Sequence, residues 1–229
     1  MTVLVVTGTG TEIGKTIVTA AVAAAHRDRR VAVLKPAQTG LAPGEAGDAA
    51  EVARLAGRHV TAVELARFPE PLAPATAARR ADLRPVRPHE IAEAAGKLAT
   101  DHDLVLVEGA GGLLVRFDDD GATLADAAGL MAAPVLVVAP AGLGTLNATA
   151  LTSEALRVRG LECLGVVVGS MPAGPDLAAR CNLEDLPVAA GAPLLGVVPA
   201  GAGALTPTDF RSRAGSWLSP ELGGSRPVA

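Results

Sequence analysis

The chain has 229 residues, which is enough for one α/β domain of ordinary size and short for two. Hydrophobic residues make up 49% of the sequence and charged residues 19%, so the chain can bury a sizeable core and does not resemble a disordered protein. Lys and Arg number 20 against 24 Asp and Glu, for a net charge of −4, and aromatic residues are only 2%. This balance argues against a basic surface for nucleic acid and against a base-stacking platform.

No membrane, secretory or disulfide-rich class is indicated either. The most apolar stretch, residues 130–146, is interrupted by Pro and Gly and is expected to be a buried strand with flanking turns. The opening MTVLVVTG has no basic region and no cleavage site, so no signal peptide is predicted. Cys163 and Cys181 lack metal or redox spacing, and two thiols in a chain of this size suit a reducing compartment. We therefore expect a cytoplasmic protein.

Six short apolar runs recur along the chain, each bounded by Gly, Pro or polar residues, as is typical of strands buried on both faces of a parallel sheet. Ala- and Leu-rich segments of helical period alternate with them. This pattern predicts a single-domain α/β fold, a doubly wound, mostly parallel sheet flanked by helices. In chain order, the expected strands are 2–6, 31–34, 103–107, 134–139, 164–168 and 194–198, and the clearest helices are 15–26, 88–99, 147–159 and 175–186. The domain is expected over 1–218, followed by a frayed tail over 219–229.

The segment VTGTGTEIGKT, residues 6–16, joins the first strand to the first helix. Backbone N–H groups of such a Gly-rich loop can cradle phosphates at the positive end of the helix dipole. Lys15 would then contact the β- and γ-phosphates, and the Thr16 hydroxyl would bind Mg²⁺. Thr9 stands where the standard G-x-x-x-x-G-K-[ST] pattern has Gly, and the alternative is a Gly-rich turn with no ligand.

The use of lysine is selective. Only three of the 20 basic residues are Lys, and two of them, Lys15 and Lys35, lie at neighbouring strand ends. A compact ammonium and a planar guanidinium are not interchangeable, so this choice favours a functional role. The alternative for Lys35, in LKPAQTG, is a side chain whose charged end simply reaches solvent at a strand terminus.

Two acids occupy comparable positions. Glu108 follows four apolar residues and precedes a glycine-rich turn, where a P-loop enzyme carries a second metal anchor. Asp48 precedes a helical run in GEAGDAAEVARLAG. Together with Thr16 they could form an oxygen-ligand set for Mg²⁺. The alternatives are an acid that starts a turn for Glu108 and a helix N-cap for Asp48.

Taken together, TGTGTEIGKT, KPAQTG with the following GDAAEVARLAG, LVEGAGGLLV and GLGTLNATALT resemble the dethiobiotin synthetase family, in its order and spacing from the first strand to about residue 200. The resemblance implies ATP-dependent ring closure of 7,8-diaminopelargonic acid with CO₂ to dethiobiotin, a step of biotin biosynthesis. One amine, as its carbamate, would attack the γ-phosphorus to give a carbamic–phosphoric anhydride, and the second amine would close the ring. The resemblance also implies Mg²⁺, ATP as co-substrate, and a homodimer with active sites at the interface.

Matched position by position, the family pattern assigns roles to specific residues. Lys35 and Lys15 would be catalytic, and Thr16, Asp48 and Glu108 would hold the metal. The nucleotide would contact Glu12, Ile13, Gly14, Lys15, Thr16, Ile17, Asp48, Glu108, Gly109, Ala110, Gly111, Gly169, Ser170, Pro199, Ala200 and Gly201. The other substrate would contact Thr11, Glu12, Thr39, Thr145, Leu146 and Asn147. One position departs from the pattern: Gly169 in VVVGSMP replaces the Asn that commonly reads adenine, which leaves the preferred base open.

Two other functions compete with this interpretation. A cobyrinic-acid-type amide synthase would need a glutamine-hydrolysing domain with a reactive Cys, and the chain has no room for one. A regulatory ATPase switch of the plasmid-partition type would carry an extra lysine early in the phosphate loop, where this chain has Gly10, and would respond to a protein, DNA or membrane partner. ATP turnover that requires the diamine would distinguish the enzyme from the switch.

Overall fold

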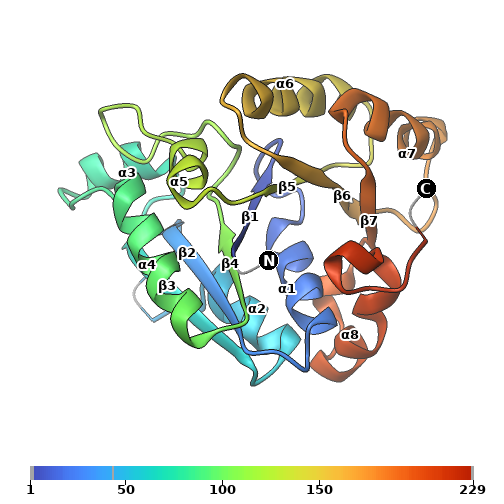
Figure 1. The fold of residues 1–229 in the computed structure, drawn as a ribbon, viewed down its shortest axis with the longest axis horizontal. Coiled ribbons are helices and arrows are strands. Elements are labelled where there is room, and N and C mark those ends of the chain that lie inside the picture. Colours follow the sequence, from blue (N-terminus) through green and yellow to red (C-terminus); the bar gives the residue numbers. More distant parts are fainter. Residues whose placement is uncertain (1–2, 43, 228–229) are drawn as a thin grey trace.

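The computed structural model describes residues 3–42 and 44–227, which form one α/β domain around a seven-stranded sheet (Figure 1). The strand order is β3-β2-β4-β1-β5-β6-β7, and every neighbouring pair is parallel. This confirms the predicted doubly wound fold. The strands are β1 (Val3–Gly8), β2 (Val31–Thr39), β3 (Val60–Phe68), β4 (Leu104–Glu108), β5 (Val135–Ala139), β6 (Cys163–Met171) and β7 (Leu194–Pro199).

Helices cover both faces of the sheet, and each face has its own apolar core. One core packs α1, α2 and α8 against the sheet, and the other packs α3 to α7. The central strands β1, β4 and β5 are buried almost throughout because both of their faces are covered, which explains their continuous apolar sequences. The helices are α1 (Lys15–Ala25), α2 (Asp48–Ala56), α3 (Pro74–Arg80), α4 (Pro88–Asp101), α5 (Leu124–Met131), α6 (Thr145–Val158), α7 (Leu177–Ala190) and α8 (Pro207–Arg213).

The order of the strands explains why the predicted site residues can meet. The β1–β4 register pairs Val6 with Glu108, and the β2–β4 register pairs Leu34 with Val107. Lys35 and Glu108, each one residue further on, therefore lie side by side at the carboxyl edge, next to the loop that leaves β1. Ligands of doubly wound folds bind at this edge.

Strand β3 was not among the predicted strands. Its sequence VTAVELARF mixes apolar and polar residues, and most of its side chains are only partly buried. β3 pairs with β2 alone, so it is an edge strand and does not need the continuous apolar run used for the prediction. Helix α7 also runs past its predicted end at 186, with Pro187 inside its last turns.

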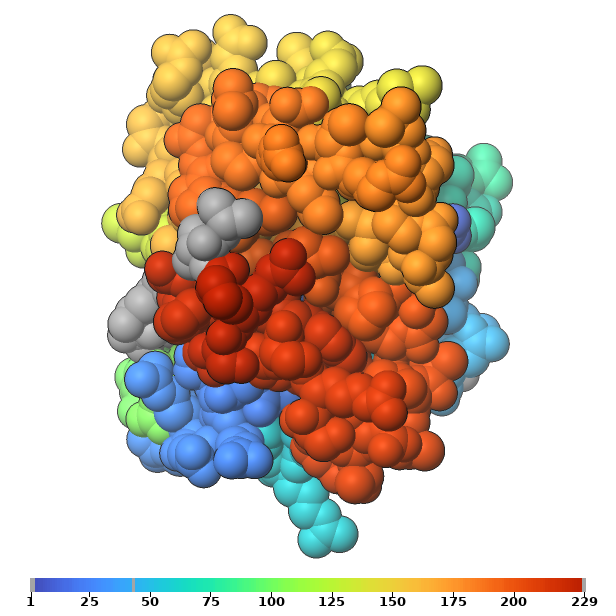
Figure 2. Space-filling model, turned by 90° about the vertical axis from the view of Figure 1, so that its right-hand side faces the viewer, coloured from blue at the N-terminus to red at the C-terminus, as the bar shows by residue number. Residues whose placement is uncertain are grey.

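The described part of the expected tail packs onto the domain. Ser219 is buried and donates its N–H to the carbonyl of Leu195 on β7 at 2.8 Å, and Leu222 in a short 3₁₀ turn is 1% exposed. Figure 2 shows the C-terminal residues, in red, spread over the surface beside the N-terminal part of the chain. The sequence predicted fraying from 219, and the structure corrects this for 219–226, where Arg226 still donates to the carbonyl of Leu218. Residues 228–229 lie outside the described residues.

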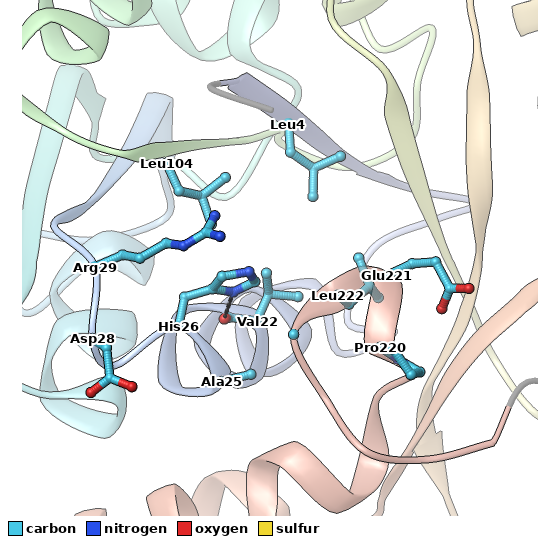
Figure 3. Close-up of a pocket in the computed structure, with 11 residues that line it drawn as sticks. Leu4, Val22, Ala25, His26, Asp28, Arg29, Leu104, Pro220, Glu221 and Leu222 are labelled. Carbon is cyan, nitrogen blue, oxygen red and sulfur yellow. Dashed lines mark hydrogen bonds between the residues drawn. The ribbon is translucent and has the colours of Figure 1, made fainter.

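This C-terminal segment also closes a cavity of about 420 Å³ at the amino end of the sheet (Figure 3). Leu4 and Leu104, near the starts of β1 and β4, form its floor, and His26 lies at its wall with Nδ1 2.9 Å from the carbonyl of Val22. No residue of the predicted site lines it. Within the described residues, no helix is long and apolar enough to cross a membrane.

Candidate active site

The loop between β1 and α1 has the backbone conformation of an anion-binding loop. Gly14 precedes the helix with φ 95°, in the left-handed region that favours glycine, and Glu12 adopts φ 58°, which is uncommon for a residue with a side chain. No side chain caps the first turn of α1, so its N–H groups are left for a ligand. A free helix start at the end of a buried strand fits a phosphate group.

Two glycines let this loop press against the end of β6. A Cβ built on Gly14 would collide with the carbonyl of Gly169, and a Cβ on Gly169 would collide with the carbonyl of Ile13. Gly169 is therefore needed for the position of the phosphate loop. The alignment with an adenine-reading Asn predicted a site for a base at 169, but no side chain fits there unless the loop moves.

Lys15 lies under this loop. Its ammonium donates to the carbonyl of Gly10 at 2.7 Å, and the residue is buried. Burial, together with repulsion from the ammonium of Lys35, lowers the pKa of Lys15 to about 8. The nearby carboxylates do not offset the cost of burying this ammonium, so the site favours an additional anionic partner, such as a phosphate.

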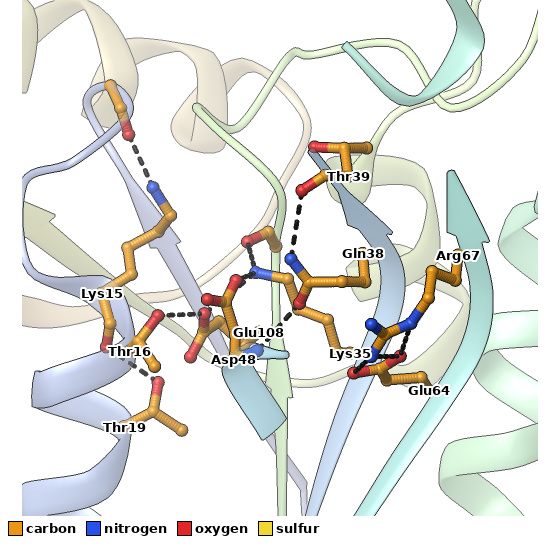
Figure 4. A network of polar contacts seen from close by, with 12 residues as sticks. Lys15, Thr16, Thr19, Lys35, Gln38, Thr39, Asp48, Glu64, Arg67 and Glu108 are labelled. Carbon is orange, nitrogen blue, oxygen red and sulfur yellow. Dashed lines mark hydrogen bonds and ion pairs between the residues drawn. The ribbon is translucent and has the colours of Figure 1, made fainter. Parts of the chain in front are cut away.

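Lys35, Glu108, Asp48 and Thr16 form one connected polar cluster (Figure 4). The Lys35 ammonium lies 2.9 Å from Glu108 Oε1, 2.5 Å from Asp48 Oδ2 and 3.1 Å from the carbonyl of Gly109. Burial alone would lower the pKa of Lys35, but the charges of Glu108 and Asp48 outweigh it and raise that pKa. Lys35 therefore stays charged, and its ammonium does not end in solvent.

The same cluster contains oxygen donors that fit a divalent cation. Thr16 Oγ1 donates to Glu108 Oε1 at 2.9 Å, while Oε2 of Glu108 is buried and has no hydrogen-bond partner in the part of the chain that the structure describes. Burying a carboxylate oxygen without a partner is costly, so it marks a place for a ligand. No group of three His, Cys, Asp or Glu suited to a metal occurs among the described residues, but Mg²⁺ needs only one or two carboxylates with water and phosphate oxygens. The donors present fit Mg²⁺.

Asp48 does not cap α2. The N-cap is Gly47, Asp48 is the first helical residue, and its carboxylate turns to Lys35. The N-cap alternative is wrong.

A cavity of about 980 Å³ opens beside this cluster. It brings together most of the predicted residues of the first half of the chain, while Ile13 and Gly109 do not line it; those that do are Thr11, Glu12, Gly14, Lys15, Thr16, Ile17, Lys35, Thr39, Asp48, Glu108, Ala110 and Gly111. Residues that the sequence analysis had not singled out extend it towards the β3–α3 connection, among them Gln38, Leu41, Leu72 and Pro74. A volume of this size accommodates a nucleotide tail and a second small substrate.

Other predicted nucleotide residues lie outside this cavity. Pro199 ends β7 and is followed by Ala200 and Gly201, and the Ala200 N–H donates to the carbonyl of Met171 at the end of β6 at 2.7 Å. Ser170, on β6, is exposed. Just beyond this turn, Gly203 packs against Ile17 of α1, so these residues lie on the far side of the phosphate loop from Lys35.

The three predicted residues of α6 do not line this cavity. α6 begins after Gly144, with φ 90°, and no side chain caps it, so neither Thr145 nor Asn147 is the N-cap. Thr145 is 1% exposed and its Oγ1 is buried without a partner, whereas Asn147 is exposed and Leu146 is half-buried. The Thr145 N–H donates to the carbonyl of Gly142 at 3.3 Å, so the start of α6 can offer a ligand the backbone N–H groups that follow and the Asn147 side chain.

Comparison with known sequences gives a consistent family. A family model described as an AAA domain matches residues 2–205. Proteins named ATP-dependent dethiobiotin synthetase from Streptomyces coelicolor and Saccharopolyspora erythraea are each 70% identical, covering 98% of this chain and 95% and 98% of their own lengths. The protein of the same name from Corynebacterium kroppenstedtii is 47% identical over 98% of this chain and 97% of its own length.

Solved structures show the same fold at low sequence identity. The MinC:MinD cell division protein complex of Aquifex aeolicus matches with a TM-score of 0.58 at 16% identity, covering 93% of this chain and 86% of the other. A ParA family ATPase from Chlorobium tepidum matches with a TM-score of 0.56 at 14% identity, covering 92% and 90%. These likenesses concern the arrangement of helices and strands alone.

Proposed function

Since the chain belongs to the family of ATP-dependent dethiobiotin synthetases, we propose that it closes the ureido ring of dethiobiotin from 7,8-diaminopelargonic acid, CO₂ and ATP at the carboxyl edge of β1, β2 and β4. The observation that carries this proposal is the Lys35 ammonium, buried among Glu108, Asp48 and a carbonyl at the wall of the large cavity. It lies beside the phosphate loop, where a γ-phosphate and a carbamate can meet. The two free thiols, Cys163 and Cys181, suit a cytoplasmic enzyme.

The chain contributes charge and alignment to this reaction. One amine of the substrate combines with CO₂ to form a carbamate, whose oxygen attacks the γ-phosphorus while ADP leaves. The second amine then attacks the carbonyl carbon of the resulting anhydride, and phosphate leaves. Both steps concentrate negative charge near the γ-phosphate, and Lys35 and Lys15 neutralise it from a largely buried position.

Thr16, Asp48 and Glu108 would hold Mg²⁺, with the free Oε2 of Glu108 turned to it. When bound, the metal would neutralise phosphate charge and orient the transferring group. Thr11, Glu12 and Thr39, which line the same cavity, would contact the diamine end of the substrate. The loop carbonyl of Gly109 helps to hold the Lys35 ammonium in place.

The nucleotide would lie across the phosphate loop, with its phosphates at the start of α1 and its base near β6 and β7. Ser170 and the 199–201 turn are exposed there and offer backbone groups to a base. Because Gly169 has no side chain to contact the base, the site selects weakly between bases, and the phosphates supply most of the affinity for the nucleotide.

We propose a homodimer in which the start of α6 of one subunit completes the cavity of the other. The N–H groups of α6 are uncapped, and a substrate carboxylate suits a free helix start. Leu143, in the preceding loop, is 94% exposed, so it would lie at the contact with the second subunit. The Thr145 side chain is buried and its N–H donates to the carbonyl of Gly142 at 3.3 Å, so the following residues, Leu146 and Asn147, would contact the ligand.

The direct test is to incubate the protein with diaminopelargonate, bicarbonate, Mg²⁺ and ATP and to measure dethiobiotin by mass. We expect dethiobiotin and ADP to form together, and ATP turnover to fall to background without the diamine. ATP hydrolysis that proceeds at an equal rate without the diamine, with no new product, would instead support a regulatory switch.

A further inference from the structure

The backbone that carries Asp48 is held by side chains outside the proposed catalytic set. The N–H of Asp48, in the first turn of α2, donates to Oε1 of Gln38 on β2 at 2.8 Å. Gln38 is 5% exposed, and its Nε2 donates to the carbonyl of Thr39 at 3.2 Å. Because the N-cap Gly47 has no side chain, Gln38 supplies from a neighbouring strand the acceptor that a capping residue supplies elsewhere.

Arg67 on β3 holds the chain just before this point. Its Nη1 donates to the carbonyl of Glu45 at 2.7 Å and to that of Ala42 at 3.3 Å. Its Nε and Nη2 both bind the carboxylate of Glu64, at 2.8–3.1 Å. Glu64 therefore fixes the plane of the guanidinium, and all three guanidinium nitrogens of Arg67 donate hydrogen bonds.

The three side chains also contact the backbone at Gly47. A Cβ built on Gly47 would collide with a carboxylate oxygen of Glu64 and would lie 2.8 Å from Oε1 of Gln38 and 3.0 Å from Nη2 of Arg67. The register places Gln38 directly opposite Arg67 across β2 and β3. Side chains of β2 and β3 thus surround the backbone of the residue that precedes Asp48, and Figure 4 shows Gln38, Glu64 and Arg67 on these two strands beside Asp48.

We propose that Gln38, Glu64 and Arg67 are positioning residues of the reaction, which fix Asp48 against Lys35 and towards the metal. This inference rests on the proposed function, in which Asp48 is a Mg²⁺ ligand. The Asp48 side chain is 35% exposed, so its position depends on its ion pair with Lys35 and on the backbone that carries it rather than on close packing. A ligand must be held within about 0.5 Å of its productive place, and partners that hold ligands typically matter roughly 10–100-fold for metal affinity or activity.

The test compares Gln38→Met and Arg67→Met with Arg30→Met as a matched control. Gln38→Met keeps length and burial and removes the acceptor. Arg30, at the other end of the sheet, forms an exposed ion pair with Asp103 at 3.3 Å. Calorimetry measures ADP affinity with and without Mg²⁺, and turnover is followed as Mg²⁺ is raised. We expect Gln38→Met and Arg67→Met to bind ADP normally without metal and to lose most of the increase in ADP affinity that Mg²⁺ brings. They should also need about tenfold more Mg²⁺ for half-maximal turnover.

Asp48→Asn separates this inference from the proposed function. If Mg²⁺ raises the ADP affinity of Asp48→Asn as much as that of the unmodified protein, Asp48 is not a metal ligand. The proposed Mg²⁺ site and the positioning role that depends on it are then both overturned. If Asp48→Asn loses the gain while Gln38→Met and Arg67→Met behave like Arg30→Met, the positioning role alone is overturned. A loss of metal-free ADP affinity in proportion to a lowered melting temperature would show that these residues serve stability only, which also overturns it.

Discussion

Lys35 is buried between two carboxylates, and its removal should affect both catalysis and stability. An ammonium that stabilises charge developing on the γ-phosphate acts on the transition state, so Lys35→Ala should lower kcat by roughly 10²–10³. Lys35→Arg should also have a low kcat, because a planar guanidinium does not replace a point charge between two anions. Dethiobiotin formation measured under saturating substrates tests this, and near-normal turnover in either variant would remove Lys35 from the mechanism.

The structure adds a condition to that experiment. Glu108 is 1% exposed, so Lys35→Ala leaves it buried without its cation, and breaking such a pair costs roughly 3–5 kcal/mol. Urea unfolding of the variant, with and without Mg²⁺, therefore belongs with the kinetics. Lys97→Ala is the control, since Lys97 pairs only with exposed Glu93 on α4 and should change neither quantity.

The lowered pKa of Lys15 predicts that nucleotide binding depends on pH. Its pKa of about 8 lies below the ordinary lysine value because of burial and the nearby Lys35, so the free protein loses this charge as the pH rises above 8. Phosphate binds the charged form. ATP affinity should therefore be constant below about pH 8 and fall by up to tenfold per pH unit above it. Binding of a non-hydrolysable ATP analogue from about pH 7 to about pH 9.5 measures this.

Lys15→Arg is the matched variant, because a guanidinium stays charged over this whole range. Its absolute affinity should be lower, but its profile should be flat. A flat profile in the unmodified protein would contradict the assignment of Lys15 as the titrating phosphate contact.

At the scale of the elements, the sequence located the apolar runs well but not every strand end: β2 was expected to end at 34 and instead continues through Lys35 to Thr39, so Lys35 lies inside the strand, level with the end of β4. Glu108 and Lys35 were found because each ends a continuous apolar run, and the interior of a parallel sheet requires such runs. Gln38 and Arg67 were missed because nothing local marks them. Their role depends on the register of β2 with an edge strand of mixed polarity, which is settled by tertiary packing.

The contact between the phosphate loop and β6 leads to a prediction about nucleotide choice. Without a side chain at 169, ring closure should proceed with CTP, GTP or UTP at a kcat/KM within roughly tenfold of ATP, or about 1.4 kcal/mol. A thousandfold preference for ATP would mean that backbone groups alone read adenine. Kinetics with the four nucleoside triphosphates decide between these outcomes.

The variant Gly169→Asn should not restore adenine selection. Its Cβ would collide with the carbonyl of Ile13, so the phosphate loop must shift and the affinity for every nucleotide should fall. Ser170→Asn, at the exposed neighbouring position, is the matched control and should keep phosphate binding intact.

At the scale of the whole molecule, the start of α6 has no side-chain cap among the described residues and lies outside the large cavity, and the loop before it exposes Leu143. A second subunit would cover that side chain and receive the helix start. Leu143→Asp should therefore shift the protein from dimer to monomer, because burying an aspartate at an apolar contact is costly. Light scattering at assay concentration measures the mass, and the monomer should retain ADP binding while its KM for the diamine rises at least tenfold. Asn147→Ala should raise that KM without changing the mass, and Val188→Asp, at a position on α7 that is 83% exposed, should change neither the KM nor the mass. A fully active monomer would show that each subunit carries a complete site.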